Sequence, residues 1–311
     1  MTPLQRYIAE EIATDHLDGL MSRREALRRL GLLGLSTAAA TAVIAACSER
    51  EQTTTATTEN TTDTAGAPTT ETQPPSAEPP GMQTALPAAA VTWAGPTGEL
   101  QGAWAEAPDA RGAVLVIHEN KGLTDHIRSV AGRFAGIGYS ALAIDLLSGQ
   151  GGTGQFADPA DATAALSKIP PEEFVANLRS GIDELSRRAP DRKLAAVGFC
   201  MGGGLVWRLL AAGAPQLAAA VPFYGPTPDD PDFAGSKDVA VLAFYGALDQ
   251  RVNATEPVAR AALEKAGLVH ELVTEPGANH AFFNDTGDRY DPTAAADAWR
   301  RIQEWFTTHL A

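Results

Sequence analysis

Residues 197–204 read Val197-Gly198-Phe199-Cys200-Met201-Gly202-Gly203-Gly204. An apolar run at 194–198 leads into this stretch, and a helical pattern over 202–212 follows it at once. The pattern Gly-x-Cys-x-Gly matches the sharp strand-to-helix turn written Gly-x-Ser-x-Gly, with sulfur in place of oxygen. Gly198 and Gly202 let neighbouring backbone pass where a Cβ would clash. We therefore expect a strained turn that presents Cys200 at the end of a strand.

Two features of this turn favour a reactive thiol at Cys200. The N-terminus of the following helix stabilises a thiolate, and the backbone N–H of Met201 is available to an oxyanion. The alternative is a buried structural cysteine in a glycine-rich turn. The turn alone does not decide between these two interpretations, and two further loops bear on them.

Asp249 and His280 each follow a predicted strand, at 239–245 and 270–274 respectively. Taken singly, Asp249 could cap the next helix and His280 could be an ordinary loop histidine. The order of nucleophile, acid and histidine along the chain is that of α/β-hydrolases. In this order and on these elements, the three residues predict a catalytic triad.

Glu119 belongs to a fourth polar segment, which follows the buried strand predicted at 113–117. In an α/β-hydrolase the loop after that strand supplies the second oxyanion donor. Glu119 would then lie at the same edge of the sheet as Cys200. The alternative is a solvated loop acid.

Strand and helix patterns alternate through the last 220 or so residues, which predicts the α/β-hydrolase fold, a mostly parallel central sheet with helices on both faces. The first two predicted strands form a hairpin, and 149–167 is expected to be a loop with a short helix. The other strands are predicted at 113–117, 140–144, 194–198, 218–224, 239–245 and 270–274. The helices are predicted at 126–137, 170–188, 202–212, 256–266 and 292–309.

Residues 1–47 resemble a twin-arginine export signal that ends in a bacterial lipoprotein box. Arg23-Arg24 precedes an apolar run at 30–46, and Cys47 would become the lipidated first residue after cleavage. The alternative is an uncleaved membrane anchor, although about 17 residues is short of the ~20 that a span needs. The leader before the arginine pair is long, which a true start at Met21 would explain.

Residues 48–88 are rich in Thr, Pro, Glu and Ala and are expected to form a disordered linker, because they have too little apolar surface to form a core. The hydrolase-like domain is then expected at 89–311. This organisation predicts an exported protein, in the cell envelope or outside the cell and lipid-anchored to the membrane.

The overall composition excludes several classes of function. A net charge of −14 argues against nucleic-acid binding, which needs clustered basic residues. Two cysteines exclude a disulfide framework and a four-cysteine zinc site. The histidines show no metal-ligand spacing and no phosphate-binding glycine loop occurs, so neither a metal nor a cofactor is expected.

The sequence resembles the dienelactone hydrolase family (carboxymethylenebutenolidase-like) over residues 91–310. The matching features are His118-Glu119 with Gly122, His126-Ile127-Arg128, Gly138-Tyr139 leading to Ala143-Ile144-Asp145-Leu146, Gly198-Phe199-Cys200-Met201-Gly202-Gly203, Tyr245-Gly246 before Asp249, and Asn279-His280 before Phe282. The resemblance implies a carboxylic ester hydrolase in which a Cys200 thiolate attacks an ester or lactone and forms an acyl-thioester.

The resemblance also implies individual roles: His280 as base, Asp249 as its orienter, and the backbone N–H groups of Met201 and Asn120 as oxyanion donors. The glutamate matching Glu119 contacts the resting thiol in that family and helps it to ionise when substrate arrives.

The sequence departs from the family where the substrate's carboxylate is bound. Family members use a serine directly after the histidine and an arginine shortly beyond it, whereas this chain has Ala281 and, around Asn284, no basic residue. A neutral ester or lactone is therefore at least as well suited as an anionic one. The alternative to an enzyme is an exported lipoprotein that binds a small molecule on the same fold without turnover.

Overall fold

The structure, a computed structural model, describes residues 1–58 and 78–310. The chain divides into two compact units, one of residues 1–77 with 163–168 and the other of residues 78–162 with 169–311. The second unit holds the central sheet and all the residues expected to form the catalytic site.

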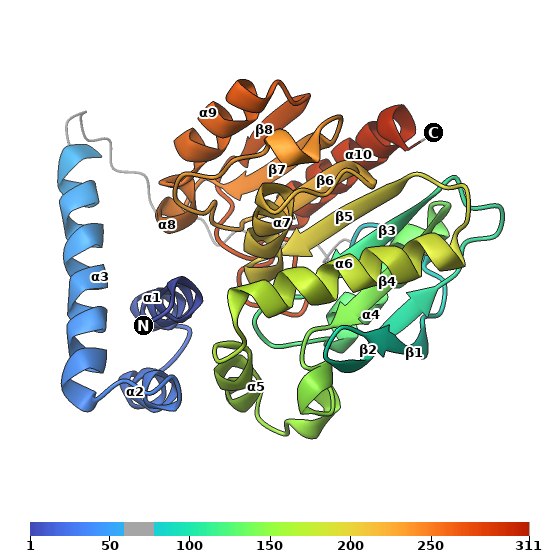
Figure 1. The fold of residues 1–311 in the computed structure, drawn as a ribbon. Helices are drawn as coiled ribbons and strands as arrows, with labels where there is room; N and C mark the ends of the chain where they lie inside the picture. Colours follow the sequence, from blue (N-terminus) through green and yellow to red (C-terminus); the bar gives the residue numbers. More distant parts are fainter. Residues whose placement is uncertain (59–77, 311) are drawn as a thin grey trace. The chain divides into compact units, whose positions relative to one another are not determined.

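An eight-stranded sheet forms the centre of the second unit, in the order β1-β2-β4-β3-β5-β6-β7-β8 (Figure 1). β1 and β2 form an antiparallel hairpin, β2 also pairs antiparallel with β4, and the remaining strands are parallel. The strands are β1 (Ala89–Gly95), β2 (Gly98–Ala105), β3 (Gly112–Ile117), β4 (Tyr139–Asp145), β5 (Leu194–Phe199), β6 (Leu217–Phe223), β7 (Ala240–Gly246) and β8 (His270–Glu275). The predicted mostly parallel sheet is confirmed.

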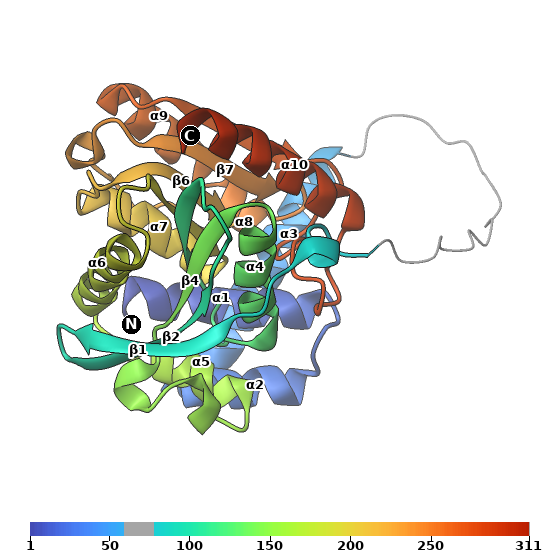
Figure 2. The ribbon, with the colours of Figure 1, turned by 90° about the vertical axis from the view of Figure 1, so that its right-hand side faces the viewer.

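Helices cover both faces of this sheet, as predicted (Figure 2). α6 and α7 pack on one face, whereas α4 and α10 pack on the other, where Phe134 of α4 contacts Trp299 and Phe306 of α10. The helices of this part of the chain are α4 (Asp125–Gly136), α5 (Pro159–Leu166), α6 (Pro171–Arg188), α7 (Met201–Ala211), α8 (Gln250–Asn253), α9 (Glu256–Ala266) and α10 (Pro292–His309).

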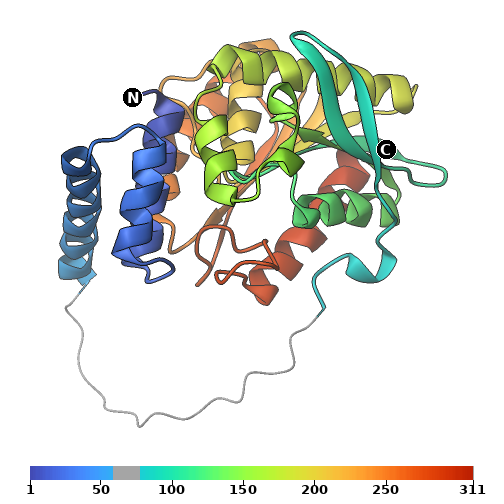
Figure 3. The same cartoon turned by 90° about the horizontal axis from the view of Figure 1, so that it is seen from below.

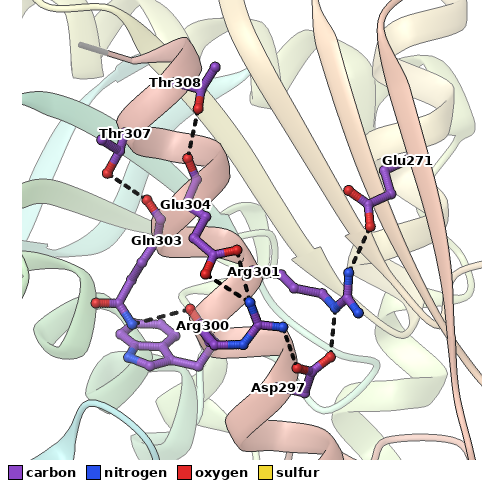
Figure 4. Close-up of polar contacts among 9 residues, drawn as sticks. Glu271, Asp297, Arg300, Arg301, Gln303, Glu304, Thr307 and Thr308 are labelled. Atoms are coloured by element: carbon purple, nitrogen blue, oxygen red, sulfur yellow. Dashed lines mark hydrogen bonds and ion pairs between the residues drawn. The ribbon is translucent and has the colours of Figure 1, made fainter.

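The continuous apolar runs explain the central strands, because every residue of β3, β4, β5 and β7 is buried. Strands covered on both faces need apolar residues at successive positions rather than in alternation. β8 differs, since it lies at the sheet edge and is only partly buried. Figure 4 shows Glu271 of β8 paired with Arg301 of α10 at 2.8 Å, next to further ion pairs along α10.

The second unit begins at Glu78, before the domain boundary expected at residue 89. Residues 82–84 form a short 3₁₀ turn, and the Leu86 N–H donates to the Gly132 carbonyl of α4 at 3.0 Å. Two glycines of α4 permit this close approach: a Cβ at Gly132 would lie 2.3 Å from the Leu86 carbonyl oxygen, and one at Gly136 would lie 2.1 Å from that of Thr84. Figure 3 shows the segment beside α4. Its composition does not indicate this packing, because these closest contacts involve backbone atoms of the segment.

In the first unit, the described residues 1–58 form α1 (Pro3–Leu17), α2 (Arg23–Leu32) and α3 (Thr37–Thr58). The apolar run at 30–46 is divided between α2 and α3 by a turn in which Gly34 has a φ of 88°. No helix among the described residues has the length and apolar character that crossing a membrane requires.

α3 continues to Thr58 and so extends into the segment expected to be a disordered linker. Its sequence there passes through Glu49, Arg50, Glu51 and Gln52, which favour helix even where a core cannot form. The rest of the expected linker up to residue 77 lies outside the described residues.

Candidate active site

Cys200 lies between β5 and α7, with a φ of 55° and a ψ of −116°. This is the strained turn that the Gly-x-Cys-x-Gly pattern predicts. A Cβ at Gly198 would lie 2.2 Å from the Gly202 carbonyl oxygen, and a Cβ at Gly202 would lie 2.3 Å from that of Ile117. Both glycines are therefore required by backbone contacts around the turn. The Cys200 side chain is buried at the carboxyl edge of the sheet.

His280 and Asp249 form a buried pair at the same edge. His280 Nδ1 lies 2.5 Å from Asp249 Oδ2, and the Val252 N–H donates to Asp249 Oδ1 at 3.2 Å. Burial acts to raise the pKa of the Asp249 carboxyl, but the charge and hydrogen bond of His280 outweigh it and lower that pKa below its usual range. Asp249 therefore stays ionised and fixes the orientation of the imidazole.

The pair is brought to Cys200. A ring nitrogen of His280 lies within 4.8 Å of Cys200 Sγ. His280 Nε2 is buried and has no hydrogen-bond partner in the part of the chain that the structure describes. With Nδ1 engaged by Asp249, Nε2 is the ring nitrogen left to exchange a proton. The structure thus groups the three residues of the expected triad.

The two expected oxyanion donors lie on adjacent segments. Met201 opens α7, and Asn120 lies in the loop after β3. β3 and β5 are parallel neighbours in which Ile117 pairs with Gly198. Glu119 and Cys200 each stand two residues beyond that pair, so the register alone brings the two loops side by side.

Glu119 is buried rather than solvated, which excludes the solvated-loop interpretation. Asn284 Nδ2 donates to Glu119 Oε2 at 2.6 Å. The other oxygen, Oε1, is buried and has no hydrogen-bond partner among the described residues. An unsatisfied buried carboxylate oxygen is costly and is therefore a sign of function.

His118 holds the backbone of the Glu119 loop. The Leu146 N–H donates to His118 Nε2 at 3.1 Å, so the ring proton is on Nδ1, which lies 2.6 Å from the Glu119 carbonyl oxygen. Burial lowers the pKa of His118 and keeps the ring neutral. The sequence pattern indicates no separate role for His118, because the tautomer of a histidine depends on hydrogen bonds that form only in the fold.

Tyr224 is another residue of the site that the sequence analysis missed. It follows β6 with a φ of 35°, is fully buried, and meets the His280 ring edge-on with centroids 5.2 Å apart. Burial, together with the charges of Glu119 and Cys200, raises the pKa of the Tyr224 phenol well above its usual value. The signal available in the sequence was a polar aromatic residue, next to Gly225, at the carboxyl end of a parallel strand.

Asn284 and Asp285 were noted in the sequence only for lacking positive charge. Asp285 lies 2.6 Å from His126 Nδ1 and 2.8 Å from Arg133 Nη2, both on α4. These contacts join the loop after His280 to the helix that follows the Glu119 loop. They could not be predicted because α4 and the His280 loop are about 150 residues apart in the chain.

Cys47 lies in the first unit, on α3. Its predicted lipidation concerns processing of the chain and stays a prediction. The expected absence of a metal and a cofactor likewise stays a prediction.

Comparison with known proteins identifies relatives of this chain. The dienelactone hydrolase family matches residues 100–310. A protein of Escherichia coli O157:H7 named "Putative carboxymethylenebutenolidase" is 36% identical over 205 residues, which are 62% of this chain and 75% of that protein.

Solved structures agree with this family. A "Putative Dienelactone Hydrolase" from Klebsiella pneumoniae subsp. pneumoniae MGH 78578 shares 31% identity over 71% of this chain and 98% of its own, with a TM-score of 0.61. A dienelactone hydrolase-like promiscuous phosphotriesterase from metagenomic libraries shares 26% identity over 72% of this chain and 100% of its own, with a TM-score of 0.64. The chain belongs to the dienelactone hydrolase family and is a hydrolase with the α/β-hydrolase fold.

Proposed function

We propose that the protein hydrolyses ester or lactone bonds with Cys200 as the nucleophile. The observation that carries this proposal is the placement of the Cys200 thiol within 4.8 Å of a His280 ring nitrogen, on a histidine oriented by Asp249. A thiol beside a base oriented by a third group is the arrangement that nucleophilic catalysis requires.

The proposed reaction has two halves. In the first, Cys200 Sγ attacks the carbonyl carbon as its proton passes to His280 Nε2, and the N–H groups of Met201 and Asn120 stabilise the oxyanion. Collapse breaks the bond to the alcohol oxygen, which takes the proton from His280, and leaves an acyl-thioester. In the second half, His280 removes a proton from water, the hydroxide attacks the thioester, and Cys200 regains its proton as the acid departs.

We propose a neutral substrate rather than an anionic one. Ala281 stands where the family has a serine, and Asn284 where a cation would be expected. Arg133, which lies near this loop, is already paired with Asp285. The buried Asp249 carboxylate adds negative charge to the site, which disfavours a carboxylate on the substrate.

The test uses the full chain and its Cys200→Ala variant, assayed on p-nitrophenyl acetate and on carboxymethylenebutenolide. We expect turnover that is lost in the variant and a higher kcat/KM on the neutral ester. Equal turnover by the variant would overturn the thiol mechanism. Saturable binding of either compound without turnover would instead support the ligand-binding alternative.

We also propose that the chain is exported and lipid-anchored through Cys47. The arginine pair Arg23-Arg24, the following apolar run and the sequence Ile44-Ala45-Ala46-Cys47 support this. Mass spectrometry of the mature N-terminus in a bacterial host tests it. A diacylglyceryl-modified Cys47, absent from a Cys47→Ser variant, is the expected result, and an unprocessed N-terminus would contradict it.

A further inference from the structure

Asn284 is the side chain that holds Glu119, and its own orientation is fixed. Asn284 Oδ1 accepts hydrogen bonds from the Thr286 N–H at 3.0 Å and from Thr286 Oγ1 at 2.7 Å. A backbone N–H can only donate, so the atom that faces Thr286 must be the amide oxygen. The amide nitrogen therefore faces Glu119 Oε2, 2.6 Å away.

The turn that carries Asn284 begins at the catalytic histidine. The Asn284 N–H donates to the Ala281 carbonyl at 2.9 Å, and the Gly287 N–H donates to the Asn284 carbonyl at 3.0 Å. Ala281 itself has a φ of 62°. The turn that holds the Asn284 amide thus follows directly after His280 in the chain.

This turn is anchored to α4 by Asp285, the residue after Asn284. The side chains of His126 and Arg133, which pair with it, are almost completely buried. Burial acts to raise the pKa of the Asp285 carboxyl, but its bonds to His126 and Arg133 outweigh that and lower the pKa to about 2. Asp285 is therefore ionised at any pH at which the protein is assayed, and it keeps the turn that carries Asn284 attached to α4.

Resting on the proposed cysteine chemistry, we propose that Asn284 is a positioning residue that acts through Glu119. By holding Oε2, the amide fixes the Glu119 carboxyl in the loop beside Cys200 and leaves Oε1, which has no hydrogen-bond partner among the described residues, to relay the thiol proton of Cys200 to His280 Nε2. The role assigned to Asn284 is therefore to position Glu119 and not to contact the reacting atoms.

The central experiment compares Asn284→Ala with the unchanged full chain on p-nitrophenyl acetate. We expect kcat to fall about tenfold, because a hydrogen bond to a charged group is lost, while KM changes less than about threefold. A loss seen only in KM, with kcat unchanged, would overturn the proposal.

A double-mutant cycle separates this role from a merely structural one. Asn284→Ala introduced into Glu119→Gln should reduce kcat by less than about twofold, because the carboxylate it positions is already gone. If the fold loss of kcat in the double variant equals the product of the losses in the two single variants, the proposal is refuted. Thr286→Val should lower kcat in the same direction as Asn284→Ala, whereas Thr286→Ser keeps the hydroxyl and should restore most of the loss.

The Cys200→Ala and Asn284→Ala variants test the thiol mechanism and the role of Asn284 separately. If Cys200→Ala abolishes turnover while Asn284→Ala behaves as the unchanged chain, only the role of Asn284 is refuted. If Cys200→Ala retains turnover, the thiol mechanism itself is refuted.

Discussion

Cys200 occupies a backbone conformation that suits glycine better than any other residue. Its φ of 55° is maintained by contacts around Gly198 and Gly202, not by the thiol. Such strain costs of order 1–3 kcal/mol and is retained where function requires the position of a side chain. The strained turn therefore lowers the stability of the folded chain but holds the Cys200 sulfur in position.

Replacing Cys200 by glycine should release this strain. We expect Cys200→Gly to have a free energy of unfolding about 1 kcal/mol higher than Cys200→Ala, although both variants lack activity. Urea denaturation followed by circular dichroism measures the difference. A glycine variant less stable than the alanine variant would show that the turn is not strained.

Asp249 should be needed for catalysis more than for folding. Asp249→Asn keeps the size of the side chain but loses the charge that orients His280, so kcat should fall by about 10²–10⁴-fold. Asp288→Asn, an exposed residue of the loop after His280, is the matched control and should leave kcat unchanged. Similar kcat values for the two variants would contradict a triad role for Asp249.

At this scale the sequence predicted the residues whose identity is itself a signal. Cys200, Asp249 and His280 stand in a recognisable order on recognisable elements. Asn284 and Tyr224 act through contacts made only in the fold, and their residue types are ordinary in loops. No local pattern could have pointed to them.

The second unit extends past the hairpin of β1 and β2, and α4 makes this possible. Gly132 and Gly136 have no side chains, so the backbone of residues 78–88 can approach the backbone of α4 closely at these two positions. Composition identified this segment as part of a linker because the contacts need almost no side chain. The strands and long helices, by contrast, carry their periodicity in their side chains and were predicted closely.

Gly136→Ala should detach that segment without harming the catalytic site. The added Cβ would lie 2.1 Å from the Thr84 carbonyl oxygen, so the segment must move. Amide hydrogen exchange of Leu86 should then become at least tenfold faster, with kcat unchanged. Gly149→Ala, where a Cβ meets no atom within 4 Å, is the control and should not alter the exchange.

Glu275, at the end of β8, should make stability depend on pH. Burial, reinforced by the charges of Asp297 and Asp291 and opposed by Arg301 and Arg300, raises the pKa of its carboxyl to about 7. An unfolded chain releases this proton near pH 4.5, whereas the folded chain keeps it until about pH 7. The free energy of unfolding should therefore fall as pH rises from about 4.5 to 7 and stay low above it.

Glu275→Gln removes this titration. At pH 8 the variant should be more stable than the unchanged chain by about 1–3 kcal/mol, whereas at pH 4 the two should be alike. Thermal denaturation across this pH range measures the effect. A constant difference at all pH values would point to packing rather than to the charge.

The whole molecule carries a net charge of −14, and this should influence substrate choice at a distance. An anionic lactone is repelled by such a surface, and salt screens the repulsion. We expect kcat/KM for carboxymethylenebutenolide to rise with sodium chloride between about 10 and 500 mM, while the value for p-nitrophenyl acetate stays constant. An opposite trend for the lactone would reveal an attractive cationic site.

The fold as a whole was predictable because strand–helix alternation allows few arrangements. The division of the N-terminal region into separate helices was less predictable. Its apolar run is continuous in sequence, yet a turn at Gly34 divides it into two helices. Composition describes what a segment can bury but not where its backbone turns.

The open edge of the sheet has one more consequence, for solubility. An exposed strand is a template on which further chains can grow into aggregates, and proteins protect such edges with charge. β8 carries Glu271, which Arg301 binds from α10. A strand from a second copy of this chain would have to displace that ion pair. The two copies would also repel each other, because both carry a net negative charge. The ion pair between Glu271 and Arg301 thus disfavours the pairing of a further strand with this edge of the sheet.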